Sequence, residues 1–182
     1  MTEARAEAVT DNAAPFNINS RLNMQIVYPR FLRFRVGATG ATINQVDFIV
    51  PVASVGTGTP IAGTGGETGG GSAANVEVVG NFGQVTITAT NNSGGLGLGT
   101  GVVADGRINY NQIQTASNLA QLPAPVLTNA GGSTSQPTLN TPVVTQRTAV
   151  WTFNYLNTTV PSAGTFGNTA NGGRVTYTAT MP

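Results

Sequence analysis

The segment 16–28 constrains the fold most, because its side chains alternate in character for thirteen residues. One face carries Phe16, Ile18, Ser20, Leu22, Met24, Ile26 and Tyr28, and the other carries Asn17, Asn19, Arg21, Asn23, Gln25 and Val27. A period of two residues is typical of a β-strand with one apolar face. Strands in globular proteins usually have about 5–6 residues, so this strand is long, and nothing before it offers a partner. Pro29 ends it.

The rest of the chain also favours strands and turns. It contains 24 glycines and 10 prolines among many threonines, asparagines and valines, a mixture that suits pleated strands and disfavours helices. Alternating segments separated by Gly/Pro turns predict seven or eight strands and therefore an all-β sandwich. The expected strands are 30–36, 43–50, 76–79, 84–90, 107–113, 143–155 and 174–181. Segments 76–79 and 84–90 are expected to form a hairpin around 80–83.

The residue types present leave little for catalysis. The chain has no Cys, His or Lys, so it lacks the usual nucleophile–base pairs, zinc ligands and phosphate-loop lysine. Three of the seven carboxylates lie in the first eleven residues, and Asp47, Glu67, Glu77 and Asp105 are far apart in sequence. No Ca²⁺-loop pattern of clustered carboxylates is present. We therefore expect no enzyme activity, no metal and no cofactor.

Two residue clusters have an ordinary and a functional interpretation. Arg30, Arg33 and Arg35 lie close together, but the formal net charge is only +1, whereas a nucleic-acid binder usually has a strongly basic domain. A solvated or interface strand is the favoured interpretation, without nucleic-acid binding. The alternating aromatics of 151–155 could form a ligand platform, although same-face aromatics more often belong to a core.

No apolar run reaches the ~18–20 residues of a membrane-spanning helix. Residues 1–11 also lack the apolar region of a signal peptide. If the protein is exported, this chain is expected to be a mature or engineered form with Met1 added.

An amphipathic strand without a partner needs a groove for its apolar face. Burying six apolar side chains would contribute of order 10 kcal/mol before costs, whereas an exposed strand invites aggregation. The segment could fold onto its own domain, cover another subunit or remain disordered. Addition to another subunit would be β-augmentation in a head-to-tail arrangement, which grows an open filament.

The two ends of the chain resemble the major subunits of chaperone–usher pili. The resemblance rests on the alternating N-terminal segment, on the Gly–aromatic turn from Pro161 to Phe166, and on the terminal alternating strand from Gly173 to Pro182. It implies an incomplete immunoglobulin-like β-sandwich that lacks its last strand. Residues 1–28 would be the N-terminal arm and donor strand, and residues 29–182 the pilin domain. Unlike better-known pilins, this chain has no disulfide.

The resemblance also implies which residues meet at the subunit contact. The donor residues would be Phe16, Ile18, Ser20, Leu22, Met24 and Ile26, with Ser20 as the small residue among large ones. The acceptor groove would be bordered by segments 31–36 and 174–181. Its lining would be Phe31, Phe34, Val36, Val175, Tyr177 and Ala179.

The same resemblance implies like subunits, a periplasmic chaperone and an outer-membrane usher as partners, and a fimbria on the cell surface as the location. Two other functions remain open from the sequence. One is a viral or compartment shell protein with a jelly-roll fold. The other is a monomeric carbohydrate-binding module that uses Trp151 or the tyrosines.

Overall fold

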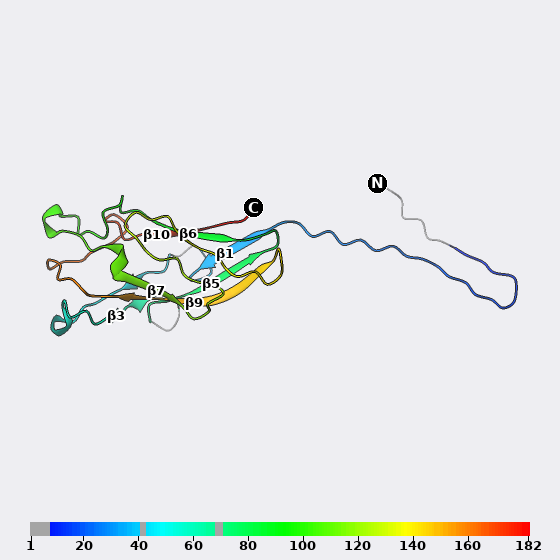
Figure 1. Ribbon diagram of the computed structural model, residues 1–182, viewed down its shortest axis with the longest axis horizontal. Coiled ribbons are helices and arrows are strands. Elements are labelled where there is room, and N and C mark those ends of the chain that lie inside the picture. The colour runs from blue at the N-terminus through cyan, green and yellow to red at the C-terminus, as the bar shows by residue number, and fades with distance from the viewer. Residues whose placement is uncertain (1–7, 41–42, 68–70) are drawn as a thin grey trace.

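The fold consists of short and long β-strands joined by turns (Figure 1). The computed structural model describes residues 8–40, 43–67 and 71–182. Its strands are β1 (Leu32–Val36), β2 (Val46–Asp47), β3 (Ile61–Ala62), β4 (Thr64–Gly65), β5 (Ala73–Gly80), β6 (Thr86–Asn91), β7 (Ile113–Ser117), β8 (Ser133–Ser135), β9 (Thr145–Tyr155) and β10 (Val175–Thr180). The only helical pieces among these residues are the 3-10 turns η1 (Val52–Ser54), η2 (Val103–Asp105) and η3 (Tyr110–Gln112). The all-β prediction is confirmed.

The larger sheet is antiparallel and is built around β9. Trp151 lies opposite Ala74 of β5 and also opposite Ser117 of β7, so these two strands flank β9 on opposite edges. Strand β1 pairs with β5 on its far side, and β3 pairs with the end of β9. The long strand β9 is therefore central, whereas β1 lies at an edge.

The smaller sheet has the order β10-β6-β8, with β6 in the centre. Threonines occupy its outward positions, where a β-branched side chain suits an exposed strand. They are Thr86, Thr88 and Thr90 of β6, opposite Thr180, Thr178 and Thr176 of β10. Strands β2 and β4 form a separate two-stranded piece.

The two larger sheets share one hydrophobic core. Val76 and Val78 of β5, Ile87 of β6 and Trp151 of β9 belong to the same buried cluster. Alternation along each strand turns these side chains inward and their neighbours outward. The indole Nε1–H of Trp151 donates to the carbonyl of Leu122 at 3.1 Å, which satisfies the polar end of this buried ring.

The predicted hairpin between 76–79 and 84–90 is wrong in its pairing. Both strands exist, but β5 pairs with β1 and β9, and β6 pairs with β10 and β8. The turn at 81–85 crosses from one sheet to the other, so Val78 and Ile87 face the core from two sides. Alternation gives the inward side of a strand but does not show to which sheet it belongs.

Two other expected strands are shorter or displaced. Only Val46–Asp47 of segment 43–50 is paired, and the exposed Ile43 and Ile49 show that this segment lies at the periphery. Segment 107–113 is not a strand: it contains η3, and β7 begins only at Ile113.

We predict that Ile87→Ala lowers the free energy of unfolding by about 2–5 kcal/mol, because it leaves a cavity between the sheets. Ile87 is 0% exposed, whereas Ile49 is 76% exposed, so Ile49→Ala should change the stability by no more than about 0.5 kcal/mol. Equilibrium unfolding in guanidinium, followed by the fluorescence of Trp151, measures both. Equal losses for the two variants would contradict the assigned core.

Candidate subunit-binding site: an exposed arm and an open seam

Residues 8–28, here named the arm, extend away from the sheets (Figure 1). No residue of the arm belongs to a strand, and nearly all its side chains are exposed. The exposed fraction of the large donor-face side chains ranges from 51% at Ile18 to 85% at Met24. The remaining predicted donor residues, Phe16, Ser20, Leu22 and Ile26, are also exposed. The apolar face predicted for segment 16–28 therefore lies outside the core.

A turn near the start of the arm is organised by Asp11. Its carboxylate accepts hydrogen bonds from the backbone N–H groups of Ala13 at 3.0 Å and Asn17 at 3.1 Å. These bonds favour the ionised form and hold the pKa of Asp11 below its usual value. Of the N-terminal segment 1–12, residues 1–7 lie outside the described residues.

Strands β1 and β10 lie next to each other but belong to different sheets. In the described part of the chain, β1 pairs only with β5, and β10 pairs only with β6. Each strand therefore has one edge without a ladder. We name the boundary between these two edges the seam.

Burial is less complete along the seam than in the centre of the sheets. The inward residues Val76 and Val78 of β5 are 1% and 0% exposed, and Ile87 of β6 is 0% exposed. The core-facing residues of both edge strands are only partly buried. They are Leu32, Phe34 and Val36 of β1, Val175, Tyr177 and Ala179 of β10, and the adjacent Met181. A strand placed at the seam would have apolar side chains to cover.

The seam is narrow at the end where β1 begins. A Cβ at Gly80 would lie 2.9 Å from Sδ of Met181 and 3.3 Å from Cδ1 of Leu32. Leu32 and Met181 therefore approach the same glycine from the two sheets. Since β1 starts here and β10 ends here, the two strands run in opposite directions along the seam.

The structure brings five of the six predicted acceptor residues together on the inward side of the seam. They are Phe34, Val36, Val175, Tyr177 and Ala179. The sixth, Phe31, lies before β1 and is 44% exposed. Its side chain is on the same face as that of the outward-facing Arg33, two residues further on, so it does not line the inward side of the seam. Sequence reasoning omitted Leu32 and Met181, although both alternate in phase with predicted acceptor residues.

Tyr177 connects the seam to the core. Its ring centroid lies 5.3 Å from that of Trp151, with the ring planes tilted by 59°. Burial, and secondarily Tyr110, raises the pKa of Tyr177. Burial also raises the pKa of Tyr110 to about 12, and its hydroxyl donates to the carbonyl of Gly172. Both phenols are therefore held neutral in the folded protein.

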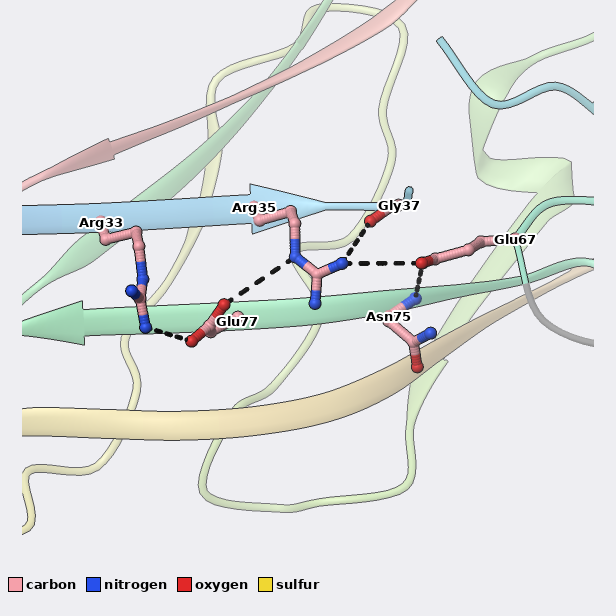
Figure 2. A network of polar contacts seen from close by, with 6 residues as sticks. All are labelled: Arg33, Arg35, Gly37, Glu67, Asn75 and Glu77. Atoms are coloured by element: carbon pink, nitrogen blue, oxygen red, sulfur yellow. Dashed lines mark hydrogen bonds and ion pairs between the residues drawn. The ribbon is translucent and has the colours of Figure 1, made fainter. Parts of the chain in front are cut away.

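The outward face of β1 carries a network of ion pairs (Figure 2). Arg33 Nη2 lies 2.5 Å from Oε1 of Glu77. Arg35 lies between two carboxylates, with Nη1 3.5 Å from Glu67 and Nε 3.8 Å from Glu77. The other oxygen of Glu67 accepts the backbone N–H of Asn75 at 3.2 Å. Arg33 and Arg35, two of the three arginines clustered in the sequence, therefore bind β1 to Glu77 of β5 and to Glu67.

The aromatics of 151–155 do not form an exposed platform. Trp151, Phe153 and Tyr155 are 0%, 8% and 6% exposed, so the interpretation as core residues is confirmed. A shallow hollow of about 300 Å³ is lined instead by Asn109, Asn111, Thr128 and Asn129.

Within the described ranges, no three His, Cys, Asp or Glu side chains gather as a set of metal ligands. The same residues include no helix with the length and apolar character needed to cross a membrane. Comparison of the chain with protein-family models, curated proteins and solved structures finds no match.

We predict that the protein loses stability as the pH rises from about 10 towards 12. The raised pKa values of Tyr110 and Tyr177 mean that the folded state keeps protons that the unfolded state releases above pH 10. Stability therefore falls with rising pH in this window. Tyr177→Phe should flatten the fall, as measured by melting temperatures between pH 8 and 12. Tyr28→Phe, at an exposed arm position, is the control and should leave the melting curve unchanged. A steeper fall in Tyr177→Phe would contradict the assignment.

Proposed function

We propose that this chain is a structural, non-enzymatic subunit of a bacterial surface filament. It polymerises by placing its arm in the seam of the next copy. The chain is then an incomplete immunoglobulin-like sandwich completed by its neighbour, as the resemblance to chaperone–usher pilins implies. The donor residues are those of the alternating face of 16–28.

One observation carries the proposal: the described part of the chain has an exposed, alternating apolar segment and, at the seam, two strand edges without a ladder. The arm exposes Leu22, Met24 and Ile26 at 80%, 85% and 81%. The seam has two free edges above partly buried apolar side chains. Adding a strand to an open edge satisfies main-chain groups while alternate side chains enter pockets. Both features are apolar, and each has main-chain groups that a strand ladder would pair.

The direction of β10 indicates how the arm would lie. Antiparallel ladders are slightly more stable than parallel ones, so we expect the arm to run antiparallel to β10. Its residue 28 would then lie near Val175, and the donor's body would stand beyond that end of the seam. The acceptor's own arm leaves at the opposite end, near Met181. Each copy therefore donates at one end and accepts at the other, which generates an open filament.

Such a subunit needs protection before assembly. Exposed apolar strands and open edges are aggregation sites, so a factor that occupies the seam until the next arm arrives is required. A periplasmic chaperone and an outer-membrane usher fit this role. The proposed location is a fimbria on the cell surface, reached through the periplasm, with like subunits as the permanent partners.

The alternatives are weaker on the same observations. A carbohydrate-binding module that uses Trp151 has no accessible platform, because the ring is 0% exposed. A jelly-roll shell protein could also exchange an arm, but its contacts would close into a particle. Electron microscopy separates closed particles from filaments.

We predict that the full chain forms thin filaments and an SDS-resistant ladder that collapses on boiling. A version lacking residues 1–28 should form neither, because it has a seam but no arm. Leu22→Asp should also abolish assembly, since a buried carboxylate without a partner is strongly unfavourable. Asn23→Asp adds the same charge one residue away, on the opposite face, and should assemble. Filaments from the truncated chain, or closed shells from the full chain, would refute the proposal.

We further predict that two variants, each unable to assemble alone, form a single arm–seam contact when they are mixed. Leu22→Asp keeps an intact seam, and Ala179→Arg keeps an intact arm while its arginine blocks the seam. Mixed together, they should give a one-to-one dimer and nothing longer, as measured by light scattering. Thr178→Arg, on the outward face of β10, should still form filaments. Dimers of either variant alone would show that another surface joins the subunits.

A further inference from the structure

The base of the arm, residues 29–31, is held by the turn that follows β5. The side-chain amide of Asn81 donates to the carbonyl of Pro29 at 2.8 Å, and its Oδ1 accepts the backbone N–H of Phe31 at 2.9 Å. The guanidinium carbon of Arg30 lies 3.4 Å from the ring centroid of Phe82, within the range of a cation–π contact. We name Asn81 and Phe82 the clamp.

The clamp fixes the conformation of the base. In an extended chain, the carbonyl of residue 29 and the N–H of residue 31 point to the same side. Asn81 binds both groups, so its side chain continues the β1–β5 ladder by one step beyond Leu32 and Gly80. The base is thereby held extended and in line with β1. Figure 1 shows the arm leaving the body at the end where the C-terminus lies.

The base is also too short for the whole arm to enter its own seam antiparallel to β10. With the last arm residue, Tyr28, at the Val175 end, the chain would have to return to Leu32 at the Met181 end. The distance along β10 and Met181 is about 20 Å, at about 3.4 Å per residue. Three residues separate Tyr28 from Leu32, and a fully extended connection of that length spans only about 14 Å.

A second route into the same molecule is a hairpin in which the arm reverses at the base and lies antiparallel to β1. That reversal requires residues 29–31 to form a turn. A turn there would break both hydrogen bonds to Asn81 and separate Arg30 from Phe82. The arm would also meet β10 in the less favourable parallel direction.

From these contacts we propose that the clamp and the three-residue base prevent the arm from filling its own seam. They direct it to a second copy of this chain. Asn81 and Phe82 are positioning residues: neither lies in the seam, and they act by setting the direction in which the arm leaves. This role rests on the proposed strand donation, and it explains why the arm does not occupy the seam of its own molecule.

Arg21 provides a readout, because trypsin can cut after this exposed arm residue only while the arm is free. The full chain is diluted until it is monomeric by size exclusion, and then concentrated in steps. Cleavage after Arg21 is followed by mass spectrometry. We compare the wild type with an Asn81→Ala/Phe82→Leu variant and with a variant that has about twelve Gly/Ser residues inserted between Tyr28 and Pro29, enough for a crossover between parallel strands.

In the wild type, we expect cleavage in the monomer and protection that grows with concentration as filaments form. Both variants should be protected already as monomers, at every concentration, and should lose filament assembly. Asn111→Ala, at an exposed position in η3, is the matched control and should behave as the wild type.

Three outcomes would overturn the inference. The dilute wild-type monomer could be protected, both variants could behave as the wild type, or Asn111→Ala could reproduce the effect of the clamp variant. Cleavage of every protein at every concentration is a different failure. It would mean that no seam accepts the arm, and it would overturn the proposed function together with this inference. Melting curves of each variant establish that the body is folded.

Discussion

Val78 and Trp151 of one sheet and Ile87 of the other belong to a single buried cluster, and this shared core joins the two larger sheets. The central strands β5, β6 and β9 have partners on both edges, so their inward side chains are buried. The sheets end at β1 and β10, beyond which the described residues supply no further strand. The incomplete cover of the seam is thus a consequence of where the strand order stops.

An open strand edge and an exposed apolar segment are each unfavourable for a protein that remains alone, because both promote aggregation. The described residues of this chain include both, at the seam and in the arm. In the proposed assembly each feature satisfies the other in the neighbouring copy, and the extended base keeps them apart within one copy. The outward faces carry threonines on one sheet and the ion pairs of Arg33 and Arg35 on the other.

Much of the local structure could be predicted from the sequence. Alternation located β1, β9 and β10 closely, identified Trp151 as a core residue, and separated the apolar face of the arm from its polar face. It failed where a segment borders the core only partly. Segment 43–50 has a strand-like pattern, yet most of it finds no neighbouring edge, so only β2 is paired.

The sequence alone determined which side chains of a strand share a face, because the two-residue period is a property of the local backbone. It also determined that a segment with one apolar face, residues 16–28, precedes the sheets. Only the tertiary structure decided that β5 and β6 lie in opposite sheets, that β1 and β10 border one seam, and that Leu32 and Met181 close its end. Strand pairing depends on contacts between segments far apart in the chain, and two sheets that share one core present the same alternating pattern.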